Sequence, residues 1–95
     1  MDDWPFYDPP NVAVFSTRSI LDQTYLVYYV SHDGEDGAWQ FMPRNGPVSM
    51  ENAAIVGLKT MLRLEPAIAE LSDLPLGWCA WRENKDDTWK RKIKE

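Results

Sequence analysis

The chain has 95 residues, 44% of them hydrophobic, and contains five Trp, four Tyr and three Phe. This length and apolar content suit one buried core, which argues against intrinsic disorder and against a second domain. The single Cys79 excludes an intrachain disulfide, and no apolar run approaches the roughly 18 residues of a membrane span. Because the start at Met1, Asp2 and Asp3 also lacks the features of a signal peptide, we expect a cytoplasmic protein.

The net charge of −5 is unevenly distributed. Residues 1–84 hold five Lys or Arg against twelve Asp or Glu, whereas residues 85–95 hold five against three. An acidic body repels phosphate backbones and attracts basic partners, so we expect no nucleic-acid binding despite the basic stretch TWKRKIKE at residues 88–95. The alternative is that the negative charge only keeps the protein in solution.

We expect a single domain over residues 1–95 that begins with an extended arm. Residues 1–10 combine three prolines with three aromatic residues, a composition that forms neither a regular helix nor a central strand. Trp4, Phe6 and Tyr7 are expected to pack onto the sheet, with a ring left exposed for a partner as the alternative.

The stretch 24–41, TYLVYYVSHDGEDGAWQF, predicts a β-hairpin. Aromatic and β-branched residues at 25–30 favour one strand, and alternation at 38–42 favours the other. Between them, residues 31–37 supply turn chemistry, with Gly34 and Gly37 able to adopt positive φ.

The rest of the chain predicts shorter elements. The apolar positions of residues 59–71 fall at helical spacing, and Pro66 divides this stripe into two short helices. Further strands are predicted at 11–16, 54–58, 77–83 and 88–93, with a helical turn at 19–22, a loop at 43–47 and a cap at Ser49. The fold class is thus α+β: an antiparallel sheet of about five strands with the helical segment on one face, and residues 85–95 as a basic C-terminal edge strand or tail.

His32, Asp33, Glu35 and Asp36 form the only cluster of potential ligands or acid–base groups. A calcium loop fails because Gly37 stands where a third oxygen ligand is needed, and zinc would need more His or Cys than the chain contains. No glycine-rich phosphate motif exists either, so we expect no metal and no cofactor. A small enzyme using His32 with a neighbouring carboxylate stays open as an alternative.

The order SHD, then DGAWQF, then LEPAIAELSDLPLGWCAWR, resembles a family of small bacterial domains of unknown function grouped with immunity proteins of polymorphic toxin systems. The similarity covers roughly residues 12–83, and Glu65 departs from it because relatives carry Asp before the proline. The resemblance implies a compact α+β domain that has no established catalysis and binds a toxin. The matching positions are Ser31, His32, Asp33, Asp36, Gly37, Trp39, Phe41, Leu64, Glu65, Pro66, Ile68, Leu74, Pro75, Gly77, Trp81 and Arg82.

These observations predict a non-catalytic protein-binding domain whose partner is another protein, with a basic toxin domain as the most concrete candidate. The alternatives are the His32 enzyme and a structural subunit, and the chain is expected to be a monomer or a homodimer. The predicted partner-binding residues are His32, Asp33, Glu35, Asp36, Trp39, Trp81 and Arg82.

Overall fold

The computed structural model describes residues 4–44 and 51–94, and it confirms the α+β class. The predicted cap at Ser49 and residues 45–47 of the predicted loop lie outside the described residues. In chain order the elements are β1 (Ala13–Thr17), α1 (Arg18–Leu21), β2 (Tyr29–His32), β3 (Trp39–Met42), β4 (Ala53–Gly57), α2 (Leu58–Leu64), the 3-10 helix η1 (Pro66–Leu71), β5 (Trp78–Trp81) and β6 (Lys90–Ile93).

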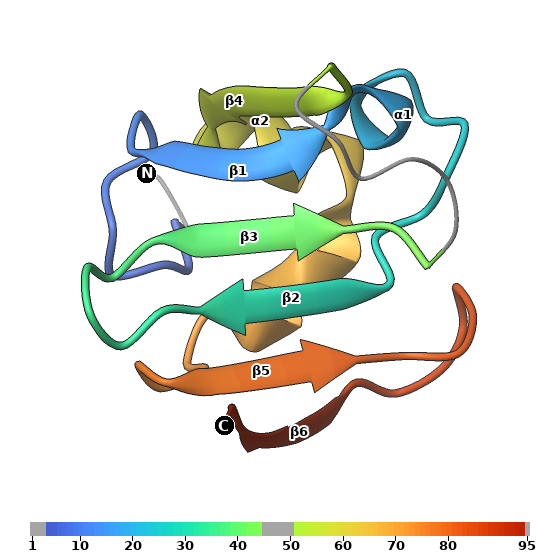
Figure 1. Ribbon diagram of the computed structural model, residues 1–95. Helices are drawn as coiled ribbons and strands as arrows, with labels where there is room; N and C mark the ends of the chain where they lie inside the picture. Colours follow the sequence, from blue (N-terminus) through green and yellow to red (C-terminus); the bar gives the residue numbers. More distant parts are fainter. Residues whose placement is uncertain (1–3, 45–50, 95) are drawn as a thin grey trace.

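The strands form one mixed sheet of six strands in the order β4-β1-β3-β2-β5-β6 (Figure 1). β1 and β3 run parallel, and the other neighbouring pairs are antiparallel. The prediction of a purely antiparallel sheet of about five strands is therefore wrong on both counts. After β1 the chain passes through α1 and enters the sheet again as β2, two positions away from β1. β3 then lies between these two strands and runs in the same direction as β1.

The first strand of the predicted hairpin lies further along the chain than expected. β2 begins only at Tyr29, and residues 25–28 are irregular. The carbonyl of Val27 accepts a hydrogen bond of 3.0 Å from Nε of Arg82, so a side chain satisfies a backbone group that a strand partner would otherwise take. The strand runs on to His32, opposite Trp39, and Gly37 in the following turn has the expected positive φ of 74°.

The break in the helical segment lies where the sequence predicts it. α2 ends before Glu65, whose φ of −138° and ψ of 82° are not helical, and Pro66 opens η1, a 3-10 helix of six residues instead of an α-helix. Met61, Ile68 and Leu71 of the apolar stripe are fully buried. α2 has only seven residues, and none of the described helices is long and apolar enough to cross a membrane.

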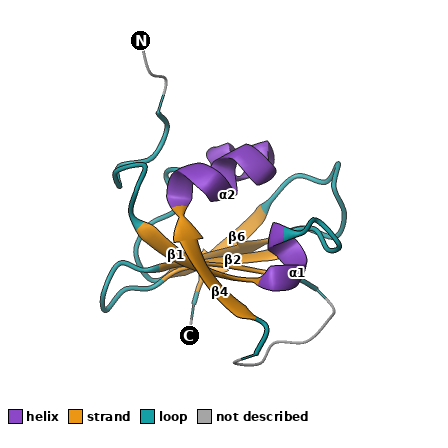
Figure 2. Cartoon of the chain, turned by 90° about the horizontal axis from the view of Figure 1, so that it is seen from above, coloured by secondary structure: helices purple, strands orange, loops and turns teal. Residues whose placement is uncertain are grey.

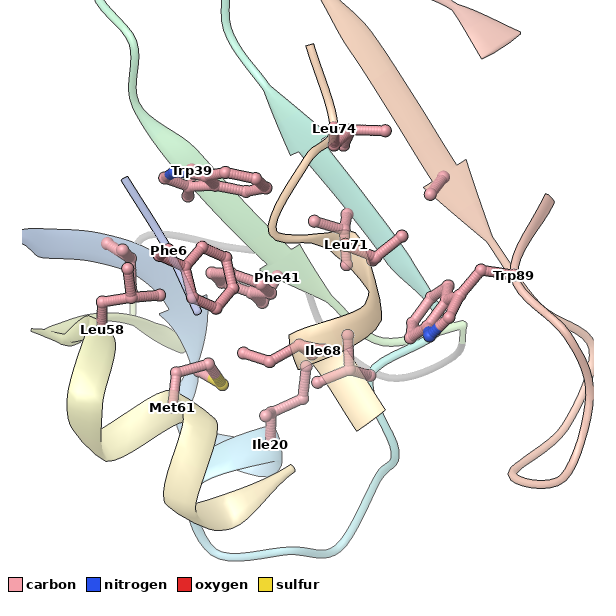
Figure 3. Packing of buried hydrophobic residues seen from close by; sticks show 14 residues of the cluster. Phe6, Ile20, Trp39, Phe41, Leu58, Met61, Ile68, Leu71, Leu74 and Trp89 are labelled. Atoms are coloured by element: carbon pink, nitrogen blue, oxygen red, sulfur yellow. The ribbon is translucent and has the colours of Figure 1, made fainter. Parts of the chain in front are cut away.

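The core lies between one face of the sheet and the layer formed by α2 and η1 (Figure 2). Phe6 brings the N-terminal arm into this core, where its ring meets Trp39 edge to face at 5.3 Å (Figure 3). Tyr7, the next residue, is 99% exposed, so the arm both packs on the sheet and presents a ring to solvent. No described helix covers the opposite face of the sheet (Figure 2).

The basic C-terminal segment splits into a buried anchor and an exposed edge. Trp89 is buried, and its indole Nε1 donates a hydrogen bond of 3.1 Å to the carbonyl of Ala67. β6 then covers only Lys90–Ile93, and its four residues are exposed. The edge-strand prediction is confirmed in a shorter form than the predicted 88–93.

Candidate functional site

Three segments that are far apart in sequence meet at one end of the sheet (Figure 1). They are residues 7–12 of the arm, the β2–β3 turn at 33–38 and the η1–β5 connection at 72–77. Together they line an open groove with a volume of about 680 Å³. We call it the end groove.

Each wall of the end groove is fixed by backbone hydrogen bonds. The part of the arm that follows Phe6 is attached to α2, because the carbonyl of Pro10 accepts a hydrogen bond of 2.8 Å from the amide of Lys59. The turn closes with a bond of 2.8 Å from Asp33 N to the carbonyl of Ala38, and Gly77 N donates to the carbonyl of His32 at 2.7 Å. The site is therefore formed before any partner arrives, which lowers the entropic cost of binding.

His32 and Trp39 form the floor of the end groove. Their rings stack with centroids 3.9 Å apart and an interplanar angle of 14°. Nδ1 of His32 lies 2.8 Å from the carbonyl of Leu74, so this nitrogen carries the proton and donates to the η1–β5 connection. Trp39 is buried, and its indole N–H finds no hydrogen-bond partner in the part of the chain that the structure describes.

Carboxylates from all three walls surround this floor. Asp8 comes from the arm, Asp36 from the turn and Asp73 from the η1–β5 connection. Asp73 is paired with Arg91 at 2.8 Å, and Asp36 accepts a bond of 2.9 Å from the amide of Ala38. Asp8 and Asp36 have no cationic partner within residues 4–44 and 51–94, so the end groove is negatively charged.

The predicted acidic cluster does not act as one unit. Asp33 turns to the uncovered side of the sheet, where its carboxylate lies 3.0 Å from Nζ of Lys94 and 3.1 Å from Nε2 of Gln40. Its charge is neutralised within the chain. Glu35 is exposed beside it, in a neighbouring hollow of about 480 Å³, and only Asp36 and His32 of the predicted cluster line the end groove.

Burial removes two predicted contact residues from the surface. Trp39 and Arg82 are each 2% exposed, so neither presents its side chain at the surface in this conformation, and their assignment as partner contacts stays a prediction. Arg82 also follows the last residue of β5, whereas the end groove is lined by residues that precede the start of this strand. Trp81 is half-buried on the uncovered sheet face, where Nζ of Lys92 lies 5.6 Å from its ring centre.

The surroundings of His32 bear on the enzyme alternative. No hydrogen bond or ion pair joins His32 to a carboxylate in the described ranges, and Leu74 occupies its Nδ1. Cys79 is buried. The burial of Tyr29, together with its hydrogen bond to the Cys79 thiol, raises the pKa of Tyr29 to about 12. Among the described residues no group of three or more His, Cys, Asp or Glu is placed to hold a metal ion.

Sequence reasoning did not assign Asp8, Asp73 and Leu76 to a binding site, and it named Tyr7 only in the alternative that a ring of the arm stays exposed for a partner. Tyr7 and Leu76 are the large apolar side chains of the end groove that stay exposed, at 99% and 57%. The signal for Tyr7 is its place in the proline-rich arm, because an extended segment with three aromatic residues is not expected to bury every ring. The other three need the tertiary arrangement to be recognised.

Comparison with known proteins gives no match to the sequence or the fold, whether among protein-family models, curated proteins or solved structures. The family resemblance therefore stays a prediction from the sequence. Any functional assignment rests on the geometry of the end groove.

Proposed function

We propose that this protein is a non-catalytic binding domain that holds a basic segment of a partner protein in the end groove. The observation that carries the proposal is the placement of Asp8 and Asp36, unpaired with cations among the described residues, beside the exposed Tyr7 and Leu76. Apolar contact supplies affinity, while the carboxylates select and attract a Lys- or Arg-rich segment.

The buried indole N–H of Trp39 adds a second element of recognition. A buried donor without a partner is rare in folded proteins, and each case calls for an explanation. Because the Trp39 ring lines the end groove, a backbone carbonyl of a bound segment is a suitable acceptor after a small displacement. A basic toxin domain, the partner implied by the family resemblance, would supply such a segment.

The test is affinity capture from the native host, followed by binding measurements on the recovered partner. Asp8→Asn with Asp36→Asn removes two charges from the end groove while keeping side-chain shape. Asp86→Asn with Asp87→Asn removes the same charge from the β5–β6 turn at the opposite end of the sheet (Figure 1). We expect the first pair to weaken binding about tenfold or more, mainly through slower association, and the second pair to change it less than about twofold. Equal effects of the two pairs would contradict the assignment of the end groove.

The enzyme alternative makes a different prediction. If His32 acted as a base, His32→Gln would abolish turnover of a substrate while leaving its binding intact. In the binding account, the same substitution weakens the partner complex through loss of the stack on Trp39 and of the bond to Leu74.

A further inference from the structure

The two edges of the sheet differ sharply in chemistry. β6 forms one edge with the sequence KRKI, whose three cations discourage another strand from pairing. β4 forms the other edge with the sequence AAIVG, which contains neither a charge nor a proline. An edge strand without these features is open to strand addition.

The register of β4 on β1 fixes which backbone groups face this free edge. Arg18 N donates to the carbonyl of Asn52 at 2.8 Å, and Leu58 N donates to the carbonyl of Val12 at 2.9 Å. Bonded and non-bonded pairs alternate along an antiparallel ladder, so the amides and carbonyls of Ala53 and Ile55 point away from β1. No backbone bond from these two residues to another described segment is present.

The side chains beside this edge are apolar and exposed. Ile55 is 64% exposed on the uncovered face of the sheet, directly opposite Phe15 of β1, which is 42% exposed. β4 and β1 lie at the rim of the sheet with no described helix over that face (Figure 2). Unpaired backbone groups and exposed apolar side chains therefore coincide at one strand.

We propose that a second copy of this chain pairs antiparallel with β4 about a two-fold axis, with Ile55 opposite Ile55. A second copy fits because this symmetry is self-complementary: it places one uncharged edge against another and aligns Phe15, Ile55, Ile55 and Phe15 in a single row across the joined sheets. It also brings together two chains with a net charge of −5, so the dimer strengthens as salt screens their repulsion. This dependence is opposite to that of a basic segment binding in the end groove, which salt weakens.

The contact is limited to one short strand and its flanking side chains. It falls below the roughly 1,200 Å² of a stable interface, so we expect self-association in the micromolar range or weaker. The matched substitutions are Ile55→Lys on this edge and Ile93→Lys on the β6 edge, where Ile93 is 61% exposed. Ala53→Lys is a second block of the β4 edge, at another exposed position.

Sedimentation velocity from about 10 µM to about 1 mM measures the association, and amide exchange by NMR at the two extremes locates it. The expected result is a dimer that forms at high concentration, is promoted by salt, is lost in Ile55→Lys and Ala53→Lys, and persists in Ile93→Lys. Extra protection should appear at the amides of Ala53 and Ile55. A wild-type chain that stays monomeric to 1 mM, or a dimer that survives both β4 substitutions, would overturn the proposal.

Discussion

The guanidinium of Arg82 lies 3.1 Å from the carboxylate of Glu65, in a pair that is almost completely buried, with the two side chains 2% and 13% exposed. The same guanidinium donates from Nε to the carbonyl of Val27 and stacks over the ring of Trp89 at 4.4 Å. One side chain thus joins the irregular segment 25–28, the start of η1 and the C-terminal segment. This position explains the burial of a residue that the sequence predicted to be on the surface.

Replacing Arg82 should therefore destabilise the fold strongly. Arg82→Met leaves the Glu65 carboxylate without its cation and the Val27 carbonyl without its donor, and we expect a loss of about 3 kcal/mol or more in the free energy of unfolding. Arg82→Lys should restore little of it, because an ammonium cannot combine these bonds with stacking on Trp89. Urea denaturation measures both variants.

The exposed pair of Arg44 and Glu83 is the control, since its side chains are about half exposed and 2.7 Å apart. Glu83→Gln should cost less than about 1 kcal/mol. A similar loss in this variant and in Arg82→Met would contradict the structural role assigned to Arg82.

Two neighbouring aromatic residues of the arm should differ in their importance for stability. Phe6 is buried against Trp39, whereas Tyr7 is in solvent at the rim of the end groove. We expect Phe6→Ala to cost about 3 kcal/mol or more through the lost ring and the resulting cavity. Tyr7→Ala should stay within roughly 0.5 kcal/mol of wild type while weakening partner binding. Thermal unfolding followed by binding measurements separates the two effects, and a large stability loss in Tyr7→Ala would contradict this description of the arm.

Stability should fall at alkaline pH through Tyr29. Burial, and then the hydrogen bond to Cys79, raise the pKa of Tyr29 from 10.0 to about 12 in the folded chain. Below pH 10 the phenol is neutral in both the folded and the unfolded chain, so the contribution of Tyr29 to the free energy of unfolding is fully present. As the pH rises toward about 12, the unfolded phenol ionises first and stability is lost. Tyr29→Phe should therefore flatten this decline in urea titrations at successive pH values. Parallel curves for wild type and Tyr29→Phe would contradict the assignment.

The end of α1 contains a backbone position that favours glycine. Gln23 has φ of 65°, and hydrogen bonds from Gln23 N to Ile20 and from Thr24 N to Ser19 form a Schellman motif. Gln23 is exposed, so Gln23→Gly relieves the left-handed conformation without loss of packing. We expect a net gain of roughly 0.5 kcal/mol in the free energy of unfolding, because the relief of the left-handed conformation exceeds the entropic cost of ordering glycine. A rise in Tm measures this gain. A lower Tm in this variant would exclude strain at Gln23.

Local patterns in the sequence predicted most of the elements. The turn with Gly37, the break at Pro66 and the strand around Cys79 each depend on residues that are close together in the chain. The parallel pairing of β1 with β3 depends instead on where the chain returns after α1, and strand propensity contains no information about that path.

The site was harder to predict than the fold for the same physical reason. His32 and Asp36 were recognised because they lie in one glycine-bearing turn, but Asp8 and Asp73 join them only through the tertiary structure. Arg82 was predicted to contact a partner, but the structure buries it. Its burial depends on Glu65 and Trp89, whose pairing with it no local pattern reveals.

Chemical-shift mapping of the captured partner onto the isotope-labelled protein tests the central claim most directly. We predict that the amides that shift or broaden cluster in residues 7–12, 33–38 and 72–77, and that the Trp39 indole N–H signal moves with them. Perturbations centred on the β5–β6 turn or on the uncovered sheet face, with the end groove unchanged, would contradict the account.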